Sequence, residues 1–354
     1  MDYNHIIREV IRIIDIDIAK IEFELQAETK ITLPVFKESA LRGGFGQVLK
    51  KMVCVYSYDK LCHDCELAGT CPFSVIFSPS NPEEGFLKHH RGIPRPYIIR
   101  ISEEKNIFLP GEKLRVELTL IGKSIEYFPY IFLAFKELGK SGIGKKEEGE
   151  RGKFSINTVK NMGPDGRYEI IFDRNYENKV GRIMKLSLKK MMAPLPEENT
   201  AKIFKLFFGT PVRLKKHRRI LDYPDFEAII RSAVHRLNSF SYFYGNGERE
   251  KNISNLLEEA RKVEVVSINT SFKQYSYYSH RQKSRLYLGG LVGEAVYRGN
   301  LKLFYPYLKA AELIGVGKNT AFGFGKVKVE GVNEGGIISE KCYQKQNFDF
   351  GTSS

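Results

Sequence analysis

The chain has no tryptophan, only five cysteines, and no apolar run long enough to cross a bilayer. The missing run argues against a membrane-spanning helix. The first residues include Asp2 and Glu9 and do not resemble a secretory signal, so we expect a cytoplasmic protein. Because 42% of the residues are hydrophobic, the composition also argues against a disordered chain.

The common catalytic motifs are also missing. There is no Gly-x-Ser-x-Gly, no His-Glu-x-x-His and no recognisable pair of catalytic carboxylates. Chemistry that needs only a positioned base and an acid or cation can be carried out by His, Lys, Arg or Tyr without any of these motifs. The candidate histidines are His5, His63, His89, His90, His217, His235 and His280.

Positive charge is concentrated in the second half of the chain. Residues 1–177 contain 26 Lys+Arg and 26 Asp+Glu, whereas residues 178–354 contain 30 and 16, so the second half carries the whole net charge of +14. A basic domain beside a neutral one is typical of a protein that binds nucleic acid. A lysine-rich solvated surface is the alternative, and the lack of tryptophan fits that alternative too.

A glycine- and lysine-rich segment, residues 315–326 (GVGKNTAFGFGK), lies between a predicted helix at 301–313 and a predicted strand from 327. Glycines let the backbone approach a ligand closely, and exposed N–H groups beside lysines suit phosphate. The order helix, loop, strand is the reverse of nucleotide-binding loops, which excludes that class of site. A tight turn between helix and strand is the alternative.

The same pattern occurs earlier in the chain. A predicted helix at 128–138 is followed by a glycine- and lysine-rich stretch at 139–153 and a predicted strand at 154–159. Such duplication predicts two copies of one domain. Each half shows the order β-α-β-β-α-β, so the predicted fold is α+β, with tandem ferredoxin-like (RRM-like) domains. We assign residues 1–177, with a Cys-rich insertion at about 54–96, residues 178–335, and a tail at 336–354.

A second basic segment, residues 272–285, alternates aromatic and cationic side chains (FKQYSYYSHRQKSR). Aromatic rings stack on unpaired bases, and interleaved Arg and Lys neutralise phosphates. Strand alternation places Tyr275 and Tyr277 on one face and Tyr278 and His280 on the other. Packing of the tyrosines on the core is an equally good interpretation. A third cluster, residues 215–219 (KKHRR), is either a solvated turn or an RNA contact.

Four cysteines cluster as Cys54, Cys62, Cys65 and Cys71. In a cytoplasmic protein this cluster favours a metal site over disulfides, and four thiolates suit structural zinc. An iron–sulfur cluster uses the same ligands, and unligated thiols are a further alternative. Four thiolates leave no open coordination position, so any metal bound here would stabilise the insertion rather than take part in catalysis.

Several segments resemble the RAMP superfamily of CRISPR-associated proteins, and more narrowly the endoribonucleases that process CRISPR repeat transcripts. They are residues 40–46 (ALRGGFG), the four-cysteine run, 231–237, 278–282 (YSHRQ), 288–293 (LGGLVG), 297–299 (YRG) and the glycine loop. The resemblance implies tandem ferredoxin-like domains that hold RNA along a basic groove. It also implies a metal-independent cut in which the 2′-hydroxyl attacks and a cyclic phosphate forms.

Several members of this group carry a histidine in the first helix of domain one, where this sequence has Lys37 and Arg42 instead. We therefore predict a guide-RNA-processing endoribonuclease whose general base or acid is His280, assisted by Tyr278 and Lys283, with Arg281 on the scissile phosphate. The predicted RNA contacts are Gly315, Gly317, Lys318, Gly323, Gly325, Lys326, Tyr275, Arg285, Arg298, Lys215, Lys216, Arg218 and Arg219. The expected partner is the repeat transcript, with other CRISPR effector subunits as further candidates, and we expect a monomer or a homodimer. A non-cleaving RNA-binding subunit, or a metal protein with a basic surface, are the alternatives.

Overall fold

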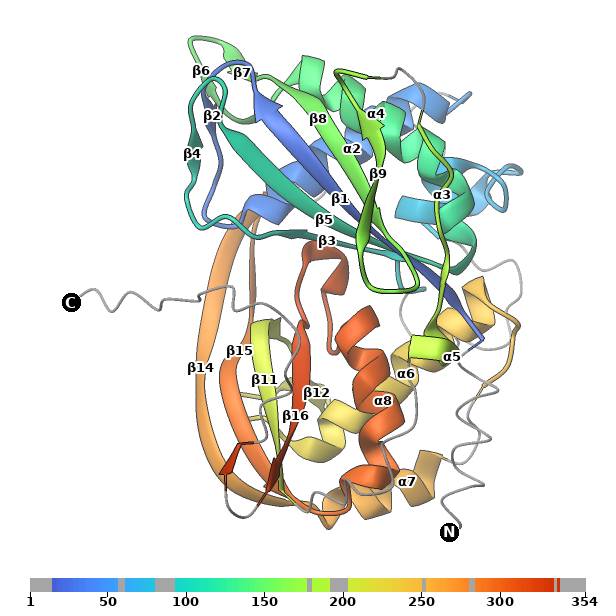
Figure 1. The fold of residues 1–354 in the computed structure, drawn as a ribbon, viewed down its shortest axis with the longest axis vertical. Helices are drawn as coiled ribbons and strands as arrows, with labels where there is room; N and C mark the ends of the chain where they lie inside the picture. The colour runs from blue at the N-terminus through green and yellow to red at the C-terminus, as the bar shows by residue number, and fades with distance from the viewer. Residues whose placement is uncertain are drawn as a thin grey trace, which may run out of the picture.

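The computed structural model describes residues 15–56, 61–79, 93–176, 180–191, 203–249, 253–279, 284–333 and 336–337. The chain forms two halves stacked along the long axis, each an antiparallel sheet with its main helices on one face (Figure 1). The predicted α+β class is therefore confirmed. None of the helices in these ranges is long and apolar enough to cross a membrane.

The first half is built on a sheet with strand order β3-β5-β1-β8-β9, and β10 pairs with β1. The strands of the first half are β1 (Asp17–Ala27), β2 (Ile31–Thr32), β3 (Tyr97–Ile101), β4 (Ile107–Phe108), β5 (Lys113–Ile121), β6 (Ile143–Glu147), β7 (Glu150–Gly152), β8 (Phe154–Met162), β9 (Tyr168–Asp173) and β10 (Leu186–Ser187). Of these, β2 pairs with β4 and β6 pairs with β7, each pair outside the main sheet. Its helices are α2 (Lys37–Val53), α3 (Pro72–Phe77), α4 (Phe128–Ser141) and α5 (Leu188–Met191), with 3₁₀ turns η1 (Cys62–Asp64) and η2 (Gly122–Tyr127).

The second half repeats this plan with strand order β14-β15-β11-β16-β17. Its strands are β11 (Ile203–Val212), β12 (Lys215–Lys216), β13 (Arg219–Ile220), β14 (Glu264–Ser279), β15 (Ser284–Arg298), β16 (Val327–Asn333) and β17 (Gly336–Ile337). Its helices are α6 (Phe226–Tyr244), α7 (Ile253–Arg261) and α8 (Leu301–Ile314), with the 3₁₀ turn η3 (Thr320–Phe322). In both halves the first strand of the unit lies between its third and fourth strands.

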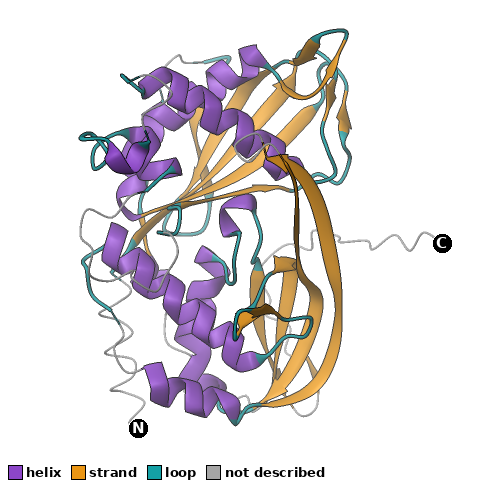
Figure 2. Ribbon diagram, turned by 180° about the vertical axis from the view of Figure 1, so that it is seen from behind, coloured by secondary structure: helices purple, strands orange, loops and turns teal. Residues whose placement is uncertain are grey.

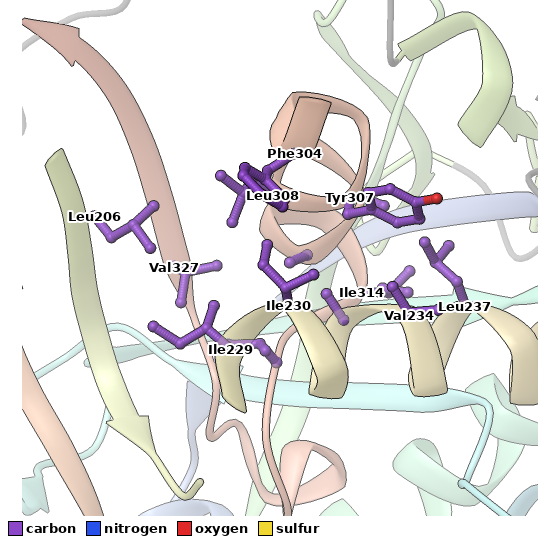
Figure 3. Close-up of a cluster of buried hydrophobic side chains, with 14 of the residues drawn as sticks. Leu206, Ile229, Ile230, Val234, Leu237, Phe304, Tyr307, Leu308, Ile314 and Val327 are labelled. Atoms are coloured by element: carbon purple, nitrogen blue, oxygen red, sulfur yellow. The ribbon is translucent and has the colours of Figure 1, made fainter. Parts of the chain in front are cut away.

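Alternating apolar residues explain why each sheet buries one face. On β1, Ala19, Ile21, Phe23 and Leu25 are buried against the helices, while the residues between them are less buried. In the second half, the apolar faces of α6 and α8 meet over β11 and β16, as the labelled side chains of Figure 3 show. Each half thus has a core that needs both of its long helices.

The predicted elements form close to where the sequence placed them, with two differences. The apolar residues after Ser39 predict a helix at 39–53 with Ser39 as its cap, but the helix starts at Lys37. The Ser39 hydroxyl donates to the Phe36 carbonyl from inside the first turn, at 2.7 Å. The sequence pattern predicts strands at 263–273 and 286–297, but the strands of hairpin β14–β15 are longer and extend to Ser279 and from Ser284. Their cross-strand pairing continues where the apolar alternation stops.

The two halves share an interface rather than a flexible link. Ile16, Ile18 and Ile121 of the first half belong to the core of the second. The Tyr244 hydroxyl at the end of α6 donates to the Pro94 carbonyl at 2.9 Å. Hairpin β14–β15 and the loop after α8 reach up to the first half, which is clear in both ribbon views (Figures 1 and 2).

Candidate nucleic-acid interface

The glycine loop after α8 is part of the contact between the halves. Gly315, Gly317, Gly323 and Gly325 are all buried and all have positive φ, between 75° and 83°. Their N–H groups donate to the Ala311 carbonyl, the Ser232 hydroxyl, the Thr320 carbonyl and the Pro211 carbonyl respectively. The expectation that these four amides are free to bind phosphate is therefore wrong for this structure, since the protein itself uses them.

The loop carbonyls are held as firmly as the amides. Arg236 on α6 donates to the carbonyls of Ile314 and Gly315, at 2.6 and 2.9 Å. Thr210 donates to the Gly323 carbonyl at 2.8 Å, and Arg100 on β3 donates to the same oxygen at 3.4 Å. The glycines are needed because the loop backbone passes so close to its neighbours: a Cβ on Gly323 would lie 2.6 Å from the Ile99 carbonyl.

An aromatic cluster joins the hairpin, the loop and the start of α2. The Phe36 ring lies 5.2 Å from the Tyr275 ring and 5.5 Å from the Phe324 ring, centre to centre. The Tyr277 ring lies 5.6 Å from that of Phe322. Tyr275 and Tyr277 do share a face, as predicted, but that face packs against protein. The Tyr275 ring is stacked on Phe36 and is not available as an open platform for a base.

The predicted catalytic residues are mostly beyond what the structure describes. His280, Arg281 and Lys283 lie outside the described residues, and of Tyr278 only the backbone is described, paired with Arg285. The described part of β14 nevertheless ends near α2, because Tyr277 lies 6.2 Å from Phe36, the residue just before that helix. The catalytic assignment stays a prediction.

Cations from both halves gather beside the loop. We call Lys20 on β1, Arg100 on β3, Arg236 on α6, and Lys318 and Lys326 of the loop the cationic seam. Burial lowers the pKa of Lys20, and the positive charges of Arg100 and Lys326 lower it further, whereas the carboxylates of Glu117 and Glu312 oppose this change. Burial also lowers the pKa of Arg236 to about 9, again with a contribution from Arg100.

The rest of the seam follows the same electrostatic pattern. Partial burial lowers the pKa of Lys318, as do the charges of Arg236 and Lys215. Burial lowers the pKa of Arg100, although Glu117 and Glu38 oppose this change. One guanidinium nitrogen of Arg100, Nη2, is buried with no hydrogen-bond acceptor among the described residues. Buried cations that repel one another stabilise a bound anion more than cations already neutralised by carboxylates.

The remaining predicted RNA contacts fall into two groups. Lys318, Lys326, Arg285, Lys215, Arg218 and Arg219 are exposed and belong to the second half. Arg298 is exposed but pairs with Glu264 at 3.3 Å. Lys216 is held by Asp225 at 3.0 Å and by Glu227 at 2.8 Å, which ties hairpin β12–β13 to α6. His217 and Arg218 both have positive φ and form its two-residue turn, which agrees with the solvated-turn alternative.

Two titratable groups with shifted pKa values lie at the start of α2, and one of them, Glu38, interacts with Arg100 of the seam. Burial raises the pKa of Glu38, whose Oε1 accepts from the Ile101 N–H at 3.3 Å. Burial lowers the pKa of Lys37, whose ammonium donates to the Glu104 carbonyl at 2.9 Å. Both shifts move the groups toward neutral pH, where proton transfer is most effective. No sequence motif singled out Glu38, Lys20, Arg100 or Arg236, because their proximity depends on how the halves pack.

The four cysteines of the predicted metal site all lie within the described residues, and Cys54 and Cys71 are close enough to Cys62 to affect its pKa. Within the described ranges, no group of three or more His, Cys, Asp or Glu side chains is placed to hold an ion. All four cysteines are free and partly exposed, and the Cys54 thiol donates to the Tyr56 carbonyl at 3.4 Å. Burial raises the pKa of the Cys62 thiol. The predicted metal site stays a prediction.

Both halves of the chain are similar to known proteins. Residues 206–327 match the family model described as CRISPR-associated endoribonuclease Cas6, and residues 16–183 match a model described as an N-terminal domain. An uncharacterized protein of Archaeoglobus fulgidus is 25% identical over 305 residues, covering 84% of this chain and 92% of its own length.

Two solved structures share the fold. One is a Cas6 product complex, with a TM-score of 0.53, 18% identity and coverage of 88% of this chain and 99% of the other. The second, Thermus thermophilus Cas6, has a TM-score of 0.51, 15% identity and coverage of 89% and 98%. At these identities the similarity to the two structures shows only a shared fold. The similarity to the Cas6 family rests on the family model that matches the second half. Residues 206–327 thus match the Cas6 family of CRISPR-associated endoribonucleases, which confirms the resemblance that the sequence predicted.

Proposed function

We propose that this protein binds CRISPR repeat transcripts along the cationic seam and cuts them into guide RNAs without a metal ion. The observation that carries the proposal is the seam itself, which brings five cations from both halves together beside the segment matched by the Cas6 model. RNA phosphates would add negative charge to that of Glu38, Glu117 and Glu312, which lie near Lys20 and Arg100. Lys318 and Lys326, which reach solvent, would contact the backbone first.

The proposed reaction needs no external nucleophile. A base removes the proton of a ribose 2′-hydroxyl, the oxygen attacks the adjacent phosphorus, and the 5′-oxygen leaves with a proton from an acid. The products are a 2′,3′-cyclic phosphate and a free 5′-hydroxyl. We assign the base or acid role to His280, with Tyr278 and Lys283 assisting and Arg281 on the phosphate. Lys37 and Glu38, beside Phe36 at the start of α2, are the candidates for the second proton-transfer group.

The direct test is incubation of the protein with repeat RNA in excess chelator. We expect cleavage that ends in a cyclic phosphate and disappears when a single 2′-deoxy nucleotide replaces the one at the break. Cleavage that requires added divalent metal, or that survives the 2′-deoxy substitution, would disprove the mechanism.

A non-cleaving RNA-binding subunit of a CRISPR effector complex is the second candidate. One observation favours it: α2 carries Lys37 and Arg42 but no histidine, and the Arg42 guanidinium is stacked 4.2 Å from the Phe322 ring centre. Tight binding of repeat RNA that weakens steeply with salt, with no cleavage in any condition, would establish this function instead.

The residue assignment has its own test. We expect His280→Ala to slow cleavage about 100-fold or more, because a positioned acid or base contributes 10²–10⁴, while RNA affinity changes little. His217→Asn is the matched control, since His217 is exposed at a turn and asparagine tolerates its positive φ of 48°. Equal losses of rate and affinity in His280→Ala would reduce His280 to an RNA contact.

We further propose that the two halves are two ferredoxin-like domains, at 1–177 and 178–335. The support is the order β-α-β-β-α-β in each half, with the same strand arrangement. The Cys-rich segment between α2 and β3 would then be an insertion in the first domain. Partnership with other CRISPR effector subunits and a cytoplasmic location are part of the same proposal.

A further inference from the structure

The glycine-rich stretch of the first half forms a pocket that the proposed function does not use. Strands β6 and β7 pair through a two-residue turn, Glu148 and Gly149, both at positive φ. This hairpin, α2 and the end of α4 enclose a cavity of about 380 Å³. Its volume is within the range of sites that hold small ligands.

The chemistry of the pocket favours an anion. Lys146 and Arg151 line it, and within the described ranges neither side chain has a carboxylate partner. Glu150 also lines it but is paired with Lys153 at 2.8 Å, so its charge is offset. Glu147, at the end of β6, is likewise taken by Lys30 at 3.1 Å. The pocket therefore carries two uncompensated positive charges.

The rest of the lining suits a ribonucleotide rather than a bare ion. Gln47 on α2 and Ser141 at the end of α4 offer hydrogen-bonding groups, and Val48 and Leu138 provide an apolar wall. At Gly44 the helix packs closely against this wall, since a Cβ there would lie 2.8 Å from Leu138 Cδ1.

Helix α2 connects the pocket to the seam. Arg42 touches Phe322 of the glycine loop, and Gln47, five residues further along, lines the pocket. At 1.5 Å per residue these positions are separated by roughly 8 Å along the helix axis. We infer that this pocket is a binding site for a phosphate-bearing ribonucleotide, with Lys146 and Arg151 on the phosphate. This inference rests on the proposed function: we assign that nucleotide to the RNA strand bound at the seam, which would continue over α2 into the pocket.

The test compares K146Q/R151Q with K123Q/K136Q, which removes two exposed first-half lysines outside the pocket. Both pairs are exposed or only partly buried, so the thermal unfolding temperature should stay near that of the wild type. Affinity is measured for repeat RNAs of increasing length, and separately for AMP and inorganic phosphate. We expect K146Q/R151Q to bind long RNA about tenfold more weakly, with a salt slope lower by about 1.4. Short RNA that fills only the seam should be unaffected.

The outcomes separate this inference from the proposed function. A length-dependent loss in K146Q/R151Q beyond that of the control supports RNA as the source of the nucleotide. AMP or phosphate binding that K146Q/R151Q abolishes supports a free ligand instead, even if the wild type binds no RNA at all. If RNA binds the wild type but the pocket variant equals its control and AMP and phosphate do not bind, the inference is wrong and the proposed function stands. A wild type that binds none of the three disproves both.

Discussion

The two glycine-rich loops begin alike and end differently. Gly142 after α4 and Gly315 after α8 both cap their helices at a φ of 75°, and each donates its N–H to the carbonyl four residues back. Beyond the cap, the first-half chain forms the exposed hairpin β6–β7, whereas the second-half chain is buried against Arg236, Thr210 and the first half.

The difference shows what glycine is used for in each half. In the first half, Gly149 has open space where a Cβ would lie, so only its positive φ of 89° requires glycine. In the second half, a Cβ on Gly325 would lie 2.1 Å from the Val316 carbonyl. Gly149 is thus needed only to turn, whereas Gly325 is needed both to turn and to pack. The first loop has packed glycines as well, since a Cβ on Gly144 would lie 2.3 Å from the Thr32 carbonyl. Glycine content alone does not separate a binding loop from a packed one.

The largest expected effect comes from adding a methyl group to each loop. We expect Gly325→Ala to lower the free energy of unfolding by about 4 kcal/mol, because left-handed strain adds to overpacking against backbone. Gly149→Ala should cost about 1 kcal/mol, from the backbone conformation alone. Urea unfolding of both variants measures the contrast. Similar losses in the two would mean that the second loop is not held as tightly as its contacts indicate.

A third cation-rich turn, β12–β13, sharpens the comparison, because its Lys216 is held by carboxylates. Glu227 is buried and pairs with Lys216, Arg231 and Arg261. Burial alone would raise the pKa of Glu227, but the hydrogen bonds from these cations lower it to about 2. We expect Glu227→Gln to cost about 2 kcal/mol of stability, since it removes a buried carboxylate that accepts hydrogen bonds from three partly exposed cations.

The pH dependence of this network has a definite sign. The pKa of Glu227 is lower in the folded protein than its ordinary 4.5, so its stabilisation is present above 4.5 and is lost as the pH falls toward about 2. Thermal unfolding between these values measures it, and Glu227→Gln should show a shallower acid decline. The control is Glu264→Gln, whose exposed pair with Arg298 is worth at most about 1 kcal/mol. An unchanged acid decline in Glu227→Gln would contradict the assignment.

The side chains of Lys318 and Lys326 are exposed although the loop backbone is buried, so they could still bind RNA. Within the described ranges neither ammonium pairs with a carboxylate, whereas the exposed Lys328 and Lys262 pair with Glu330 and Glu259, at 2.8 and 2.6 Å. We expect the variant K318Q/K326Q to bind repeat RNA about tenfold more weakly, with a salt slope lower by about 1.4. K262Q/K328Q is the control, and equal losses in the two pairs would disprove a specific role for the loop.

The smallest effect concerns the pH response of the seam. The pKa values of Lys20 and Lys318 are lower in the folded protein, so the unfolded chain binds more protons between those values and the ordinary 10.5. Stability should therefore rise with pH across this window, while affinity for RNA falls, since RNA favours the charged forms. Unfolding temperatures with and without RNA measure both trends. In Lys20→Met, both stability and RNA affinity should depend less on pH. An unchanged pH dependence in that variant would show that Lys20 does not contribute to it.

Much of the fold was predictable because the signals are local. Apolar alternation located β1, β5 and β11, and the runs before Gly142 and Gly315 located α4 and α8. The candidate site was less predictable. Tyr275 is an aromatic residue in a basic segment, which suggests base stacking. Its ring nevertheless packs on Phe36, which is more than 200 positions away in the chain. Arg100 and Arg236 stand in unremarkable strand and helix patterns, and they come together only because the loop lies between them.

The amino-acid sequence by itself determined the duplicated unit, the order of its strands and helices, and the excess of positive charge in the second half. Periodicity and composition act over a few residues, and these features need no more than that. Tertiary structure alone decided that one glycine loop is exposed and the other is buried, and which cations meet. Packing between the halves assigns those roles, because it determines which N–H groups are bonded and which charges are removed from water.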